Sequence, residues 1–240
     1  MDHNLRKLEL GMEKLGIAVT GDQIEKFDRY ISLLIEWNKK MNLTAITDPN
    51  KIIIDHFLDS IALLKDICLK EHNRIIDVGT GAGFPGVPIK IMKPKIELVL
   101  LDSLRKRTEF LSALRDELKL SGIEIIHSRA EDLARKTEYR EQFEIVLSRA
   151  VAPLNILTEY CMPFVKPGGF FVSYKGPAAQ DELIMAQDAI KVLGGNNSCG
   201  IKDAYVPFSD KSRNLIIIEK VALTPKKFPR SPGKIKKSPL

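Results

Sequence analysis

Apolar residues recur at helical spacing along the first seventy positions of the chain. They return every three or four residues, which is the period of an amphipathic helix. Asp48 and Pro49 add a start signal, an N-cap followed by proline at the first helical position. No strand pattern precedes residue 73, so residues 1–70 are expected to form a helical region, a cap or an appendage. The predicted helices are 4–15, 22–41 and 49–66.

Beyond residue 73 the pattern changes to short apolar runs that alternate with helix-compatible stretches. Nearly continuous apolar strands separated by helices are typical of a parallel sheet covered on both faces. The last two runs have no helix between them and are expected to pair antiparallel. We predict a Rossmann-like α/β domain over 71–222, with a seven-stranded, mostly parallel sheet flanked by helices. The strands are expected at 74–79, 96–102, 123–128, 143–150, 168–176, 201–206 and 214–221, and the intervening helices at 86–92, 104–119, 130–138, 153–165 and 178–193.

The composition is that of a globular protein, with 44% hydrophobic and 28% charged residues. No apolar run approaches the roughly 20 residues of a membrane span, and the charged N-terminus is unlike a secretory signal. The three cysteines are far apart and the four histidines are scattered, so neither disulfides nor a metal site is expected. These features predict a cytoplasmic protein without a membrane partner, and a monomer is the default.

Positive charge is concentrated at the C-terminus. The chain has a formal net charge of +6, from 37 Lys and Arg against 31 Asp and Glu. Residues 225–240 hold six of the cations and no acid, so the remainder is formally neutral. The prolines here oppose a helix or a packed core, and a basic disordered tail is predicted over 223–240. Such a tail is either a solvated end or a nucleic-acid-binding segment. Its cations are Lys226, Lys227, Arg230, Lys234, Lys236 and Lys237.

A glycine-rich stretch, DVGTGAGFPGVP, directly follows the first predicted strand. Ligands of such sheets lie at the carboxyl ends of the strands, and glycine lets the backbone approach them closely. Read from Gly81, the stretch matches the dinucleotide fingerprint G-x-G-x-x-G. Read from Asp77, it is D-x-G-x-G-x-G, which suits a smaller nucleoside ligand. Asp102, which ends the second strand, has the place of a ribose-binding acid in either interpretation.

Two features favour the smaller ligand. The carboxylate of Asp77 is unfavourable beside a pyrophosphate but suits a cationic or amino-bearing ligand. The predicted sheet domain also takes up most of the chain after residue 70, so no second domain remains to bind a hydride donor or acceptor. S-adenosylmethionine fits, since Ala130 and Glu131 end the third strand, where a backbone N–H and a carboxylate can read adenine. A non-catalytic nucleotide-binding regulator on the same sheet remains the alternative from another class.

Several longer motifs carry a family resemblance. They are EWNKKMNLTAI (36–46), HFLDSI (56–61), DVGTGAGFPGVPIKI (77–91), LLDSLRKRTEFL (100–111), SRAED (128–132) and SRAVAPL (148–154). With these motifs the chain resembles the RsmG (GidB) family of bacterial 16S rRNA guanine-N7 methyltransferases, which have the class I fold. The resemblance runs from about residue 10 to 221, and the basic tail is a departure, because many members lack it.

The resemblance implies methyl transfer from S-adenosylmethionine to N7 of one guanine in the decoding-centre loop of 16S rRNA, free or in the small ribosomal subunit. A methyltransferase acting on tRNA or on a protein is the nearer alternative. The positions that the family uses for the cofactor fall on Gly79, Phe84, Ala130, Glu131 and Arg149. The loop argument adds three further cofactor-binding positions, Gly81, Gly83 and Asp102.

Guanine N7 already has a free in-plane lone pair, so no catalytic acid or base is expected and the protein needs only to align the reactants. The guanine must be accessible in a loop or extruded from its stack. His56, Asp59 and Ser60 are expected to fasten the helical region to the sheet through structural hydrogen bonds. Phosphate contacts are predicted for cations around the rim and in the tail, namely Lys106, Arg107, Arg129, Lys175, Lys226, Lys227 and Arg230.

Overall fold

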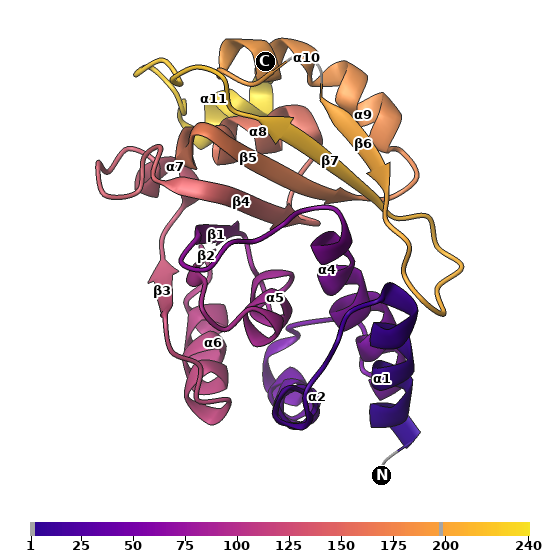
Figure 1. The fold of residues 1–240 in the computed structure, drawn as a ribbon. Helices are drawn as coiled ribbons and strands as arrows, with labels where there is room; N and C mark the ends of the chain where they lie inside the picture. Colours follow the sequence, from indigo (N-terminus) through magenta and orange to yellow (C-terminus); the bar gives the residue numbers. More distant parts are fainter. Residues whose placement is uncertain (1–2, 197–198) are drawn as a thin grey trace.

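The computed structural model describes residues 3–196 and 199–240, and its centre is a seven-stranded sheet (Figure 1). The strand order is β3-β2-β1-β4-β5-β7-β6. Strands β1 to β5 run parallel, and β7 runs antiparallel to both β5 and β6, so the predicted antiparallel pair is confirmed. The strands are β1 Arg74–Val78, β2 Glu97–Asp102, β3 Ile123–His127, β4 Phe143–Arg149, β5 Val165–Lys175, β6 Gly200–Asp203 and β7 Asn214–Glu219.

The central strands are apolar on both faces because both faces are covered. In β1, Ile75 packs into one hydrophobic cluster and Ile76 into the other. In β2, Leu98 and Val99 divide between the two clusters in the same way. Alternate side chains of a strand point to opposite faces, so an unbroken apolar run can supply two cores at once.

The N-terminal helices share a core with one face of the sheet. They are α1 His3–Leu15 and α2 Gly21–Met41; α2 lies beside α5 Gly86–Met92 and α6 Arg105–Glu117, and α1 packs against α2 (Figure 1). One hydrophobic cluster joins Leu8, Leu34 and Phe57 of this region to Ile75 and Leu100 of the sheet. Residues 1–70 were expected to be a cap or an appendage, and the described part of this region has no core of its own.

The third N-terminal helix is irregular. It begins as predicted at Asp48, whose Oδ1 accepts a hydrogen bond from the Lys51 N–H at 2.9 Å. It then runs through α3 Pro49–Ile52, a π-helical turn η1 Ile53–Leu58, α4 Asp59–Ile61 and a 3₁₀ turn η2 Ala62–Lys65. A π turn is wider than an α turn and is frequent at functional sites.

The opposite face of the sheet carries the shorter C-terminal helices. They pack with Ile76, Val99 and Val146 into the second hydrophobic cluster. The expected helix over 178–193 divides into two at Ala186. The helices are α7 Ala130–Leu133, α8 Leu154–Cys161, η3 Met162–Phe164, α9 Ala179–Met185, α10 Gln187–Val192 and α11 Pro232–Lys237.

The C-terminal segment corrects the prediction of a disordered tail over 223–240. It holds helix α11, and Phe228 and Ile235 are buried. The guanidinium of Arg140 donates hydrogen bonds to the carbonyls of Thr224 and Phe228, at 2.8 and 2.9 Å. The segment is ordered because partners distant in the sequence satisfy its backbone. Within residues 3–196 and 199–240, no helix combines the length and apolar character needed to cross a membrane.

Candidate active site

The glycine loop, residues 79–86, follows β1, and Asp77 near the end of that strand holds it in place. Oδ2 of this buried carboxylate accepts hydrogen bonds from Thr80 Oγ1 at 2.7 Å and from the Gly86 N–H at 2.8 Å. Burial raises the pKa of Asp77 to about 6, against the opposing effect of these hydrogen bonds. These bonds fasten the two ends of the loop, whereas Oδ1 of Asp77 is buried and accepts no hydrogen bond from the described residues, so the predicted contact with a cationic or amino-bearing ligand stays a prediction.

The three loop glycines, all at positive φ, meet different surroundings. A Cβ on Gly79 would lie 2.6 Å from the side chain of Val151, and one on Gly83 would lie 2.6 Å from the Tyr30 hydroxyl. A Cβ on Gly81, where φ is +61°, would meet nothing within 4 Å. Gly79 and Gly83 are therefore required for packing as well as conformation, and Gly81 faces the open cradle.

Two adjoining cavities lie at the carboxyl ends of the strands. The larger, of about 740 Å³, lies between the glycine loop, β4 and the π turn. The smaller, of about 420 Å³, lies beyond the ends of β2 and β3. Both volumes are typical of small-molecule sites. The two cavities share one wall, formed by Gly79 and by Val151, Ala152 and Pro153.

The smaller cavity brings together Gly79, Asp102, Ala130 and Glu131, as the sequence predicted from three strand ends. The Asp102 carboxylate accepts hydrogen bonds from the N–H groups of Gly81 and Leu104, each at 2.9 Å, and thereby joins two of the loops. Oε1 of Glu131 is buried and accepts no hydrogen bond from the described residues. A buried polar atom normally has a partner, so this oxygen calls for a ligand donor.

These features fit the adenosine end of S-adenosylmethionine. The open cradle at Gly81 admits a ligand against the backbone, and the free oxygen of Glu131 can accept from the amino group of adenine. Gly79, Asp102, Ala130 and Glu131 line the smaller cavity and would hold the nucleoside, and Gly81 would meet the part of the cofactor that extends into the larger cavity.

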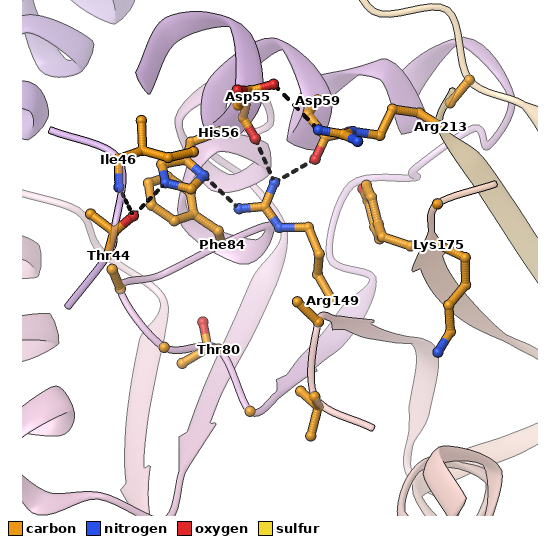
Figure 2. A pocket seen from close by; sticks show the side chains of 18 of the residues that line it. Thr44, Ile46, Asp55, His56, Asp59, Thr80, Phe84, Arg149, Lys175 and Arg213 are labelled. Carbon is orange, nitrogen blue, oxygen red and sulfur yellow. Dashed lines mark hydrogen bonds and ion pairs between the residues drawn. The ribbon is translucent and has the colours of Figure 1, made fainter. Parts of the chain in front are cut away.

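Arg149 lies at the centre of a charged network in the larger cavity (Figure 2). Its Nη1 is 2.6 Å from Asp59 Oδ2, and its Nη2 is 3.2 Å from Nδ1 of His56. Arg213, from the start of the β7 region, pairs with Asp59 at 3.1 Å and with Asp55 at 3.3 Å. The π turn carries Asp55 and His56, and Asp59 begins α4 directly after it, so the network ties the N-terminal helices to β4 and to the start of the β7 region. The expected structural role of His56 and Asp59 is confirmed.

His56 is a neutral, oriented imidazole. Burial and the neighbouring Arg149 cation lower the pKa of His56 to about 3. Because its Nδ1 accepts from the Arg149 guanidinium, its Nε2 carries the proton and donates to Thr44 Oγ1 at 2.9 Å. Ser60 connects the N-terminal helices to the sheet through its backbone, because its carbonyl accepts a hydrogen bond of 2.9 Å from the hydroxyl of Tyr174 on β5.

Phe84 is the aromatic floor of the larger cavity. The His56 ring stacks on it at 4.4 Å, and Tyr30 stacks on it at 5.2 Å. The guanidinium of Arg149 lies 5.2 Å from the ring centre, within cation–π distance. Phe84 and Arg149 therefore line the larger cavity next to the glycine loop, and their role as cofactor contacts stays a prediction.

The predicted RNA-binding cations have different surroundings. Lys106 is exposed, Arg129 is largely exposed with Glu131 at 3.8 Å, and Lys226 and Lys227 are exposed. The remaining three are engaged with acids. Arg107 pairs with Asp102 at 3.3 Å, Lys175 with Glu182 at 2.7 Å, and Arg230 with Glu159 at 2.6 Å.

Arg230 needs a correction. Its guanidinium and its backbone N–H all bond to the buried carboxylate of Glu159, at 2.6 to 3.0 Å. The cation therefore anchors the C-terminal segment, and this pairing leaves it poorly placed to bind phosphate.

Sequence reasoning missed Thr44, Asp55, Lys211 and Arg213, all of which line the larger cavity. Asp55 and Asp59 are spaced i, i+4, but that spacing alone does not distinguish site residues from surface acids. Lys211 and Arg213 follow β6 in a loop with no motif, and only the tertiary fold brings them to the π turn. No group of His, Cys, Asp or Glu in the described residues has an arrangement that could hold a metal.

Solved structures share this architecture. A SAM-dependent methyltransferase from Aquifex aeolicus aligns with a TM-score of 0.50 at 17% identity, over 71% of this chain and 93% of its own. The M. jannaschii protein TYW2, in complex with AdoMet, aligns with a TM-score of 0.51 at 11% identity, over 85% and 79% of the two chains. The strand order and these alignments show that the chain has the fold of the class I methyltransferases.

Sequence relatives define the family. The GidB family model, described as rRNA small subunit methyltransferase G, matches residues 23–216. A protein named ribosomal RNA small subunit methyltransferase G from Alkaliphilus oremlandii is 49% identical over 97% of both chains. A protein of the same name from Clostridium kluyveri is 48% identical over 94% of both. The chain belongs to the GidB family.

Proposed function

We propose that this protein methylates N7 of a guanine in the decoding-centre loop of 16S rRNA, with S-adenosylmethionine as the methyl donor. Membership of the GidB family supports rRNA of the small subunit as the substrate. The choice of a ring nitrogen is supported by the chemistry of the wall between the two cavities.

That wall carries no proton-transfer group. Gly79, Val151, Ala152 and Pro153 line both cavities, and none of them has an acidic or basic side chain. The nearest histidine, His56, is neutral and has both ring nitrogens in hydrogen bonds. An exocyclic amine or a ribose hydroxyl would have to lose a proton during methylation, whereas guanine N7 has none to lose. This observation carries the proposal.

When bound, S-adenosylmethionine supplies an electrophilic methyl group on its sulfonium. The residues of the smaller cavity would hold the nucleoside, and the glycine-loop side of the larger cavity would hold the methionine end. The rest of the larger cavity would receive the guanine, turned out of its stack, next to the methyl group. The His56 ring stacked on Phe84 and the ion pair of Arg149 with Asp59 brace these walls.

The charge on the rim suits an RNA partner. Lys106, Arg129, Lys226 and Lys227 are exposed and can meet phosphates around the extruded base. We place the enzyme in the cytoplasm with its ribosomal substrate, and we take it to act as a monomer.

The test is methyl transfer from tritiated S-adenosylmethionine to three substrates: 30S subunits, naked 16S rRNA and tRNA. Digestion to nucleosides should give labelled 7-methylguanosine from the small-subunit RNA and no label from tRNA. Label in another nucleoside would overturn the N7 assignment, and label in tRNA alone would overturn the substrate. Failure to bind the donor in calorimetry would instead favour a non-catalytic regulator.

A further inference from the structure

Helix α11 of the C-terminal segment lies at the mouth of the smaller cavity. Pro232 and Lys236 line this cavity together with Glu131 and Tyr160. The two residues of α11 are spaced i, i+4, which places them on one face of the helix. The buried side chain of α11 is Ile235, on the adjoining part of the helix.

Helix α8 holds α11 in this position. The two helices lie side by side in Figure 1. Glu159 of α8, with a side chain only 1% exposed, binds Arg230 two residues before α11. Ile156 and Tyr160 of the same helix line the cavity. One helix therefore both contributes to the cavity and fixes the segment that covers it.

A series of further contacts fastens the segment before α11. Arg140 donates to backbone carbonyls of 224–228, and Arg135 donates to the Pro229 carbonyl. The N–H of Thr224 donates a hydrogen bond to Glu141 Oε1 at 2.7 Å, and its hydroxyl donates to the Leu193 carbonyl at 2.8 Å. A wall fixed in this way is preorganised, so ligand binding does not have to order it.

We infer that the C-terminal segment is the outer wall of the cofactor site, and that Pro232 and the aliphatic stem of Lys236 retain the adenosine end of the cofactor. This inference rests on the proposed use of S-adenosylmethionine. A lysine stem can cover an apolar ligand surface while its ammonium stays in water. The exposed position of Lys236 on the cavity-lining face fits this role.

Calorimetric titration with S-adenosylmethionine and with adenosine tests the inference. A chain that ends at Ser231 lacks α11, and we expect it to bind both ligands about tenfold more weakly, since the wall lies at their common end. Lys236→Ala should weaken both by about threefold, whereas Lys236→Met keeps the stem and should restore binding. Lys234→Ala, an exposed change on the same helix outside the cavity, is the matched control.

Wild-type affinity for both ligands in the shortened chain and in Lys236→Ala would overturn the inference. A loss for S-adenosylmethionine without a loss for adenosine would do the same, because it would place the effect at the methionine end. If the shortened chain fails to fold, the Lys236→Ala and Lys236→Met pair still decides. If the intact protein binds no S-adenosylmethionine, the proposed function fails, and that result is distinct from equal binding by all variants.

Discussion

Gly81 is the loop residue at which one added side chain decides whether a ligand fits. Its missing Cβ points into open space and φ is +61°, whereas Gly79 and Gly83 face other side chains. Gly81→Val should abolish measurable S-adenosylmethionine binding, a loss of at least about 100-fold, because the side chain would fill the cradle. Calorimetry measures the affinity.

Gly16→Val is the matched control for this change. Gly16 has φ of +69° and an equally open Cβ position, but it lies at the end of α1. Both variants carry similar backbone strain, of about 1–2 kcal/mol. A Gly81→Val protein that binds the donor as well as Gly16→Val would contradict the placement of the ligand.

His56 gives a pH dependence with a defined sign. Its pKa is about 3 in the folded protein, against 6.5 for the unperturbed group, so between these values the unfolded chain binds more protons. Stability must therefore fall as the pH falls from 6.5 toward 3, by up to about 1.4 kcal/mol per pH unit. His56→Gln should remove this contribution, and the difference between wild type and variant in urea unfolding measures it.

The comparison of wild type with His56→Gln is needed because Asp77 also makes the free energy of unfolding depend on pH. Its pKa is raised from 3.8 to about 6, so the folded protein holds a proton that the unfolded chain releases. Asp77 therefore stabilises the fold as the pH falls through 6, opposite to His56, and it is present in both proteins. A pH-independent difference between wild type and His56→Gln would show that His56 titrates normally.

At the scale of elements, local pattern predicted the strands and most helices because their side chains repeat with the period of the structure. The same reasoning located Gly79, Asp102 and Glu131, since parallel strands end at one edge of the sheet. It missed Arg213 and Asp55, which meet only through the tertiary fold.

The C-terminal segment shows where local reasoning is insufficient. Its prolines and lysines lack the period of any regular element, and its few apolar side chains include Phe228 and Ile235. Order comes from Arg140 and Glu159, which are far away in the sequence. No pattern within the segment reports those partners.

The ion pair between Arg230 and Glu159 should contribute strongly to stability. Arg230→Met leaves a carboxylate buried without its cation, which should cost about 3 kcal/mol in urea unfolding. The exposed pair of Arg105 and Glu109 provides a matched control, and Arg105→Met should cost less than about 0.5 kcal/mol. Equal, small costs for both variants would contradict the anchoring role of Arg230.

At the scale of the whole molecule, the excess of positive charge lies in a segment fixed beside the smaller cavity. Lys226 and Lys227 are exposed there. If both lysines contact phosphates, changing them to Ala should make the negative slope of log binding constant against log salt concentration shallower by about 1.4. This uses the single-strand value of roughly 0.7 per phosphate contact. Filter binding of a 16S rRNA fragment at several salt concentrations measures the slope.

Lys39 and Lys40, exposed at the end of α2, form a matched pair of lysines for the same double change. An unchanged slope in the Lys226 and Lys227 variant would mean that these lysines are only solvated. An equal fall in both variants would show that the C-terminal segment has no special part in RNA affinity.

The wall formed by Gly79 and by Val151, Ala152 and Pro153 belongs to both cavities at once. Any shift that one occupant imposes on it alters the free energy of the other, and thermodynamic linkage makes the two effects equal. If the donor and the nucleobase occupy these cavities, the factor by which the donor changes the affinity for the nucleobase is the factor by which the nucleobase changes the affinity for the donor.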